Sequence, residues 1–244
     1  MSSPTARTDI AFLHTAAVHI DTFNALGAML APELVLAHAV RDDLLSAAEK
    51  AGFVTDAIDM KTQEVLMALA DSGARVVVCT CSTIGASAEA LGGETDVPML
   101  RIDRAMADIA VRTGRRIGVA ACVPTTVPNT QTLIRSSAAR AGREIAMKTF
   151  VFDDVWTLFR EGRLDDYYAG IAARLAEASR NVDVLVLAQA SMAPAALLCG
   201  DLNVPVLSSP RVGFEAAMKA VAEVKTAIAN NYQIRIPLTA IELA

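Results

Sequence analysis

The chain has 244 residues, enough for one large domain or for two domains of about 110 residues, each with its own core. Hydrophobic residues make up 53% of it and aromatic residues only 5%, so alanine, valine and leucine must fill the core, as in helices packed on a parallel sheet. The net charge of −5, without clustered Lys and Arg, argues against a nucleic-acid partner, and no apolar run reaches the roughly 18 residues of a membrane span.

The start of the chain and the cysteine content indicate the compartment. The first residues lack the apolar segment of a signal peptide. Four cysteines are too few for a disulfide scaffold in a chain of this length. We therefore expect a cytoplasmic protein with reduced thiols.

Apolar runs and capping signals predict alternating strands and helices along the first half. The first run is followed by polar residues at 14–19, which we expect to form a site loop. In chain order, we expect a strand at 10–13, a helix at 22–29, a strand at 34–40, a helix that starts near the acidic pair 42–43 and ends at Gly52, a helix at 60–70, a strand at 75–80, a strand at 98–102 and a helix at 103–111.

The same series of patterns returns in the second half of the chain. Four segments recur in the same order and at nearly constant displacement, which indicates an internal duplication. The matching pairs are 10–15 with 117–122, the acidic pair 42–43 with 153–154, 76–88 with 184–196, and 97–100 with 204–207.

The duplication predicts an α/β fold of two similar lobes, each a parallel sheet flanked by helices, related by a pseudo-twofold axis. We place the first lobe at 1–113 and the second at 114–207, and we expect the C-terminal segment 208–244 to pack back on the first lobe. The loops after corresponding strands then meet around a cleft between the lobes, where pockets commonly form. In this cleft Cys81 of the first lobe faces Gln189, its counterpart in the second.

The stretch Val76–Gly85 carries the strongest chemical signal. Three valines predict a buried strand, which ends in thiols and hydroxyls at the edge where parallel sheets bind ligands. If Ser82 or Thr83 caps a following helix, the helix N-terminus stabilises the thiolate of Cys81 and makes it a base or nucleophile. The alternative is a structural thiol, because cysteine is among the most buried residue types.

Three motifs, taken together, carry a resemblance to a known family. Residues 78–83 form a hydrophobic strand that ends in Cys, a small polar residue and Thr, residues 184–191 repeat this pattern without the Cys, and 125–127 form a threonine-bearing loop. In this order they resemble the aspartate/glutamate racemase superfamily, which includes hydantoin racemases, maleate isomerases and arylmalonate decarboxylases. The resemblance spans essentially the whole chain. It implies a cofactor-independent, Asp/Glu racemase-like isomerase that moves a proton at the carbon next to a carboxylate of a small acid.

The chain departs from the family's racemases at Gln189, where they carry a second cysteine. A glutamine amide cannot exchange a proton near neutral pH, which argues against two-base racemisation. We expect an enolate-like intermediate held by N–H groups and hydroxyls around Ser82, Thr83, Ala190 and Ser191, with Cys81 as the one protonating or nucleophilic group. The alternatives are a one-sided decarboxylase, a cis-trans isomerase on the same scaffold, or a small-carboxylate binding protein without turnover.

Further candidates for substrate binding follow the first strand of each half. His14 and Thr15 follow the first strand of the chain, and Thr125 and Thr126 follow its counterpart. These hydroxyls suit a substrate carboxylate and equally suit helix capping. His19 can also reach the cleft, whereas His38 lies within an apolar strand and is predicted to be structural.

The remaining thiols raise two further questions. Cys79 and Cys81 point to the same side of an extended chain, but zinc needs two more ligands and only Cys122 can approach, so we expect no metal and no cofactor. Cys122 is the best candidate for a replacement second thiol, and Cys199 is predicted to be core. The expected partner is a small carboxylic or amino acid, and a homo-oligomer stays open.

Overall fold

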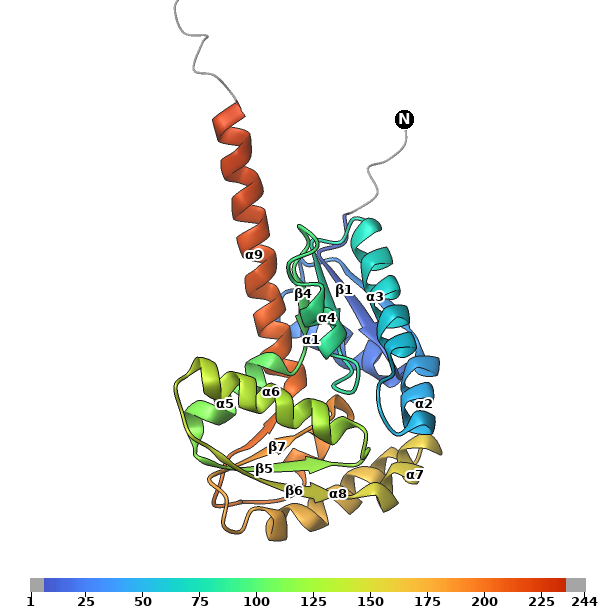
Figure 1. Ribbon diagram of the computed structural model, residues 1–244, viewed down its shortest axis with the longest axis vertical. Helices are drawn as coiled ribbons and strands as arrows, with labels where there is room; N and C mark the ends of the chain where they lie inside the picture. The colour runs from blue at the N-terminus through green and yellow to red at the C-terminus, as the bar shows by residue number, and fades with distance from the viewer. Residues whose placement is uncertain (1–6, 236–244) are drawn as a thin grey trace, which may run out of the picture.

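Two four-stranded parallel sheets form two lobes, one above the other in Figure 1. The computed structural model describes residues 7–235, and side chains up to residue 230. The first sheet has the order β2-β1-β3-β4, and the second has the order β6-β5-β7-β8. The strands are β1 Ile10–His14, β2 Leu36–Val40, β3 Val76–Cys79, β4 Met99–Arg101, β5 Arg116–Ala121, β6 Ala146–Val151, β7 Val184–Leu187 and β8 Val206–Ser208.

Helices flank both sheets and follow the same sequence in each half, as the duplication predicts. The helical elements are α1 Val18–Leu30, α2 Asp42–Ala51, α3 Asp56–Asp71, α4 Ala86–Ala90, α5 Arg104–Thr113, α6 Thr126–Arg140, η1 Asp153–Val155, α7 Trp156–Arg160, α8 Leu164–Ala178, η2 Ala190–Leu197 and α9 Ser209–Arg235. The acidic pairs 42–43 and 153–154 both lie in the first turn of a helix, where carboxylates stabilise the helix dipole.

The strand register repeats between the lobes. Ile10 of β1 pairs with Val76 of β3, and Ile117 of β5 pairs with Val184 of β7. These four residues are fully buried, as expected for central parallel strands covered on both faces. The predicted α/β fold of two similar lobes is confirmed.

The last helix of each half packs on the sheet of the other half. Met106 and Ala110 of α5 share a core with Ile117 of the second sheet, and Phe214 of α9 shares a core with Phe12 of the first. Figure 1 shows α9 in red beside the first lobe. The expected boundary at 113/114 therefore separates α5 from the sheet that it covers. Of the segment 208–244, α9 packs on the first lobe, and residues 236–244 lie outside the described residues.

A glycine permits the close approach of α9 to the first lobe. A Cβ at Gly213 would collide with the carbonyl oxygen of Ile102, which directly follows β4. Lys225 of the same helix pairs with Asp9 at 2.9 Å. Because the final helix of each half packs on the sheet of the other half, buried apolar side chains join the two lobes in addition to the chain connections.

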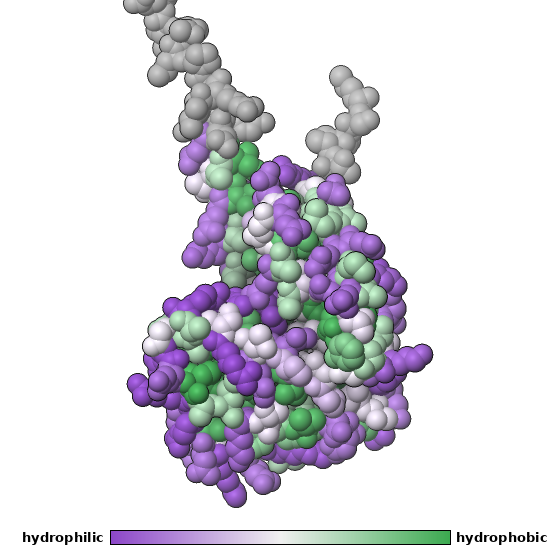
Figure 2. Space-filling view, viewed as in Figure 1, coloured by the Kyte–Doolittle hydropathy of each residue, from purple (hydrophilic) through white to green (hydrophobic). Residues whose placement is uncertain are grey.

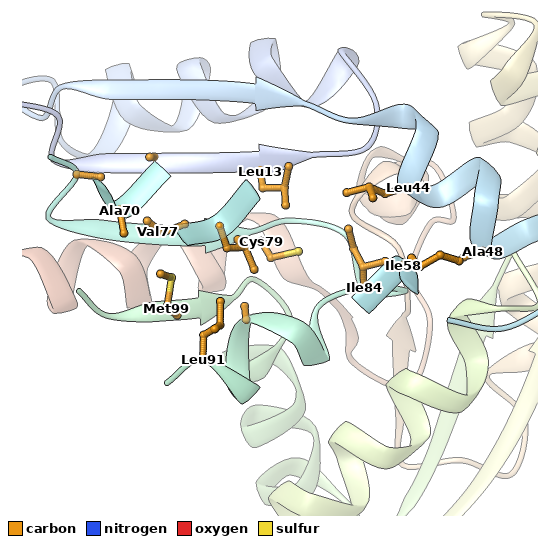
Figure 3. Close-up of a cluster of buried hydrophobic side chains, with 14 residues drawn as sticks. Leu13, Leu44, Ala48, Ile58, Ala70, Val77, Cys79, Ile84, Leu91 and Met99 are labelled. Atoms are coloured by element: carbon orange, nitrogen blue, oxygen red, sulfur yellow. The ribbon is translucent and has the colours of Figure 1, made fainter. Parts of the chain in front are cut away.

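One of the cysteines, Cys79, lies in the core of the first lobe and not in the cleft. Figure 3 shows Cys79 among Leu13, Val77 and Leu91. Its side chain is fully buried, and its sulfur donates to the carbonyl oxygen of Cys81 at 3.7 Å. Cys79 is therefore a core residue.

The surface is mostly hydrophilic, with small apolar areas, on the face that Figure 2 shows. The large exposed apolar side chains include Phe53 at 62% and Leu197 at 87% exposure. Among the described helices, none combines the length and apolarity needed to cross a membrane.

Candidate active site

A pocket lies between the two lobes, where the carboxyl ends of the central strands of both sheets meet. Its cavity volume is about 30 Å³, room for only a few water molecules. Any carboxylic acid therefore requires the walls to move apart. The lining residues are Thr15, Ala16, His19, Leu45, Thr80, Cys81, Ser82, Thr83, Val123, Thr126, Trp156, Phe159, Gln189, Ala190 and Ser191.

Cys81 and Gln189 lie in this pocket at equivalent places in the fold. Each stands two residues beyond the last residue of a central strand, β3 in the first lobe and β7 in the second. The repeat in the sequence therefore places a sulfur and an amide in the same pocket. The predicted residues Thr15, Ser82, Thr83, Thr126, Ala190 and Ser191 line it as well.

The environment of the Cys81 sulfur opposes its ionisation. Burial raises the pKa of this thiol, and hydrogen bonds from the Thr15 hydroxyl, the N–H groups of Ile84 and Thr83 and the Thr83 hydroxyl lower it by less. The expectation of a pKa lowered by a helix N-terminus is wrong here. The helix α4 begins only at Ala86, and neither Ser82 nor Thr83 caps it.

Hydroxyl groups line the pocket on both lobes. The Thr83 and Thr126 hydroxyls are 2.8 Å apart across the lobe boundary. Ser82 is buried, and its Oγ has no hydrogen-bond partner among the residues that the structure describes. Thr125 is not a lining residue: it occupies the N-cap position of α6, although its side chain makes no capping bond.

The orientation of Gln189 follows from its hydrogen bonds. Its Oε1 accepts from the backbone N–H groups of Cys122 at 2.6 Å and Val123 at 3.1 Å. Two N–H donors require the oxygen at this position, so the amide nitrogen is the other end of the group. Gln189 thus offers two N–H donors and no exchangeable acid or base.

Cys122 is not a replacement for the missing second cysteine. Its side chain is fully buried in the second lobe, in a core cluster with Tyr167 and Val155, and it is not a lining residue. Burial raises the pKa of its thiol to about 12. The Tyr167 hydroxyl lies 3.1 Å from Ser191 Oγ, which ties this core to the pocket wall.

Of the two histidines expected to reach the cleft, only His19 lines the pocket. His14 is fully buried and does not line the pocket, because its Nδ1 lies 2.8 Å from Thr80 Oγ1 and its Nε2 lies 2.9 Å from His38 Nδ1. Burial lowers the pKa of His14 to about 3. His19 lines the pocket instead, because α1 begins at Val18 and turns His19 inward. Burial lowers the pKa of His19 to about 4, so it is neutral at pH 7.

Sequence reasoning missed the apolar wall of the pocket. Trp156 and Phe159 come from α7, and their rings stack with centroids 4.6 Å apart and an interplanar angle of 9°. Leu45 of α2 adds to this wall from the other lobe. The Trp156 Nε1–H donates to Glu49 Oε1 of α2 at 2.7 Å, which joins the lobes beside the pocket. A signal was present, because the displacement that relates Asp42 to Asp153 also relates Leu45 to Trp156.

Within residues 7–235, no three His, Cys, Asp or Glu side chains come close enough together to hold a metal ion. The two cysteines considered for zinc lie in different surroundings: Cys79 is in the core of the lobe, and Cys81 lines the pocket.

Comparison with solved structures finds the same two-lobed fold. Glutamate racemase isoform RacE1 from Bacillus anthracis matches with a TM-score of 0.66 and 13% identity, covering 93% of this chain and 84% of that chain. Picrophilus torridus aspartate racemase matches with a TM-score of 0.62 and 14% identity, covering 90% and 98%. Allantoin racemase from Klebsiella pneumoniae matches with a TM-score of 0.60 and 18% identity, covering 92% and 89%. At these identities the likeness shows the fold.

A comparison with curated proteins finds no match. At the family level, residues 17–217 match the profile of the Asp/Glu/hydantoin racemases, which confirms the resemblance inferred from the motifs. This range holds β3 and β7 and all the pocket residues from His19 to Ser191. The chain therefore belongs to the Asp/Glu/hydantoin racemase family.

Proposed function

We propose that this chain is a cofactor-independent enzyme that transfers a proton at the carbon next to a carboxylate, with Cys81 as the only proton-exchanging group at that carbon. The observation that carries the proposal is the pairing of Cys81 with Gln189 at equivalent strand ends in one pocket. The family's two-lobed scaffold supports the reaction type. The amide at 189 limits the chemistry to one face of the substrate.

In the proposed complex the substrate carboxylate binds the groups that the pocket leaves free. These are the Ser82 hydroxyl and the Gln189 amide N–H groups. Hydrogen bonds from both groups strengthen as negative charge develops on the carboxylate oxygens in the enediolate. The Oε1 bonds to Cys122 and Val123 hold the Gln189 amide in place before the substrate arrives.

The proton then moves to and from one sulfur. The Cys81 thiolate removes the proton from the α-carbon, the C–H electron pair moves into the enediolate, and the thiol returns a proton to the same face as the C–H bond reforms. The raised pKa of Cys81 makes the thiolate a minor form at pH 7, and the N–H groups of Thr83 and Ile84 stabilise it when it forms.

Decarboxylation is the second candidate, and the same raised pKa favours it. A thiol that is protonated at pH 7 is a proton donor from the start. In this reaction the bond between the α-carbon and one carboxyl group of a malonate breaks, CO₂ leaves, and the electron pair enters the enediolate. Cys81 then delivers its proton to the α-carbon and recovers one from water.

Deuterium incorporation tests the proposal. The protein is incubated in heavy water with monocarboxylic amino acids and with substituted malonates, and the α-carbon is followed by NMR. We expect exchange with retention for one enantiomer, or release of CO₂ with deuterium on a single face. Cys81→Ser should abolish either reaction, whereas Cys199→Ser, a half-buried thiol outside the pocket, should leave it unchanged.

A second variant examines the role of the opposite wall. Gln189→Cys places a thiol where the family's racemases carry one, and we expect exchange with retention to become net inversion. Net inversion by the unchanged protein would contradict one-sided chemistry. Ligand binding without exchange or CO₂ release would instead support the binding-protein alternative.

A further inference from the structure

The pocket contains no positive charge to receive a second carboxylate. Among residues 7–235, no Lys or Arg lines it. The one basic side chain that does, His19, is neutral at pH 7 because burial lowers its pKa to about 4. The negative charge of a ligand must therefore be met by hydroxyl and N–H groups alone.

The groups that can receive an anion lie together at the strand ends. Ser82 follows β3, and the free end of Gln189 follows β7, so both lie beside Cys81 at the centre of the pocket. A Cys81 reaction at the α-carbon needs its carboxylate here. The one carboxylate that the chemistry requires uses these donors.

The part of the pocket formed by α2 and α7 is apolar. Trp156 and Phe159 present two parallel rings from one lobe, and Leu45 faces them from the other. The Trp156 Nε1–H is the polar group of this wall, and it is occupied by Glu49. A carboxylate against this wall would lose its hydration, and the Glu49 carboxylate would repel it, because Arg160 lies 3.8 Å from Glu49 and is mostly exposed to solvent.

From this arrangement we infer that the site takes an acid whose reacting carbon carries an uncharged, apolar substituent, such as an aryl or branched alkyl group. It discriminates against dicarboxylic acids of the aspartate or glutamate type. This specificity rests on the proposed function only in assuming that the carboxylate binds beside Cys81. The apolar substituent then lies against Trp156 and Phe159, which close on it as α2 and α7 come together.

A binding experiment tests the inference without any turnover. Trp156 is the only tryptophan of the chain, so intrinsic fluorescence reports directly on the apolar wall. The ligands are 3-phenylpropionate and succinate, which differ at one end only: 3-phenylpropionate has a phenyl group where succinate has a second carboxylate. We expect 3-phenylpropionate to bind at least about 100-fold more tightly, because an unpaired carboxylate is costly to bury.

Charge substitutions in the wall should reverse this preference. Phe159→Arg gives succinate a cation, so we expect its affinity to rise at least about 10-fold while that of 3-phenylpropionate falls. Leu45→Lys makes the same test from the other lobe if the first variant does not fold. Phe53→Arg adds the same charge at an exposed position outside the pocket, and it should change neither affinity.

Three outcomes would overturn the inference: succinate binding within about 10-fold of 3-phenylpropionate, no change in preference in either wall variant, or no fluorescence change with 3-phenylpropionate at about 10 mM. Failure of the proposed function looks different. In that case 3-phenylpropionate binds selectively, but no α-carbon exchange or decarboxylation occurs with any apolar substrate, and the specificity of the site stands.

Discussion

The hydrogen bond between Glu49 and Trp156 joins the lobes beside the pocket, and removing it should make the pocket open more easily. Glu49 Oε1 accepts from Trp156 Nε1 at 2.7 Å, and Glu49 Oε2 lies 3.8 Å from Arg160 Nη1. Since the cavity volume is only about 30 Å³, we expect α2 and α7 to separate when a ligand enters. The variant Glu49→Ala removes both interactions without replacing a residue that lines the pocket.

The two interactions differ in weight. A hydrogen bond to a charged group contributes about 1.5–3 kcal/mol, and the partial exposure of Glu49, 21%, places this one near the lower end. Arg160 is 64% exposed at 3.8 Å, so its ion pair adds less than about 0.5 kcal/mol. Loss of about 1.5–2 kcal/mol should raise the open fraction by about 10- to 30-fold. It should also lower Tm by about 3–8 °C for a chain of this size.

Acrylamide quenching of Trp156 fluorescence, together with the thermal transition, measures this effect. We expect a larger quenching constant and a lower Tm for Glu49→Ala, and smaller changes for Glu49→Gln, which keeps an acceptor but loses the charge. Glu215→Ala removes an exposed pair with Arg211, neither of which lines the pocket, and should alter neither quantity. If Glu49→Ala matches that control in both measurements, the bond does not hold the lobes together.

Three further predictions concern the buried polar groups. Asp103→Ala leaves the almost fully buried Arg101 with only the weaker pair to Glu89, so we expect the free energy of unfolding in urea to fall by about 3 kcal/mol. The control Asp108→Ala breaks a more exposed pair with Arg140 and should lower it by less than about 1 kcal/mol. The pKa of His19 is about 4 in the folded state, against the ordinary value of 6.5 in the unfolded chain. As the pH falls, the unfolded chain therefore binds a proton at His19 before the folded chain does. Stability should therefore fall as pH drops from 6.5 to 4, by up to about 3 kcal/mol, and this part of the slope should vanish in His19→Asn. Gln189→Glu should keep the Oε1 bonds and the Tm, yet abolish 3-phenylpropionate binding by replacing N–H donors with a second negative charge. Unchanged affinity in that variant would show that the amide does not contact the ligand.

Much of the architecture was predictable from the repeat. Buried valine runs and a constant displacement placed Cys81 and Gln189 at matching strand ends, and both line one pocket. The exchange of α5 and α9 was not predictable, because an apolar helix face does not specify which of two similar sheets it covers. A helix pattern predicts burial but leaves the partner open.

The finer errors at the site have physical causes. The pKa of Cys81 depends on the balance of burial against particular hydroxyl and N–H groups, which the order of residues does not reveal. His19 reaches the pocket as expected but His14 does not, because α1 begins at Val18 instead of Thr22. One turn of helix decides which imidazole faces the pocket, and helix starts are poorly specified without a clear N-cap residue.

The asymmetry of the site follows from how each lobe uses the N–H groups beside its central strand. In the second lobe, the carbonyl of Gln189 occupies the N–H groups of Cys122 and Val123. In the first lobe, the N–H groups of Thr83 and Ile84 face the Cys81 sulfur. The donors also come from different places in the two lobes, because Thr83 and Ile84 follow β3, whereas Cys122 and Val123 follow β5, the counterpart of β1. Two equivalent strand ends thus carry a thiol on one wall of the pocket and an amide on the other, and this difference is the basis of the proposed one-sided chemistry.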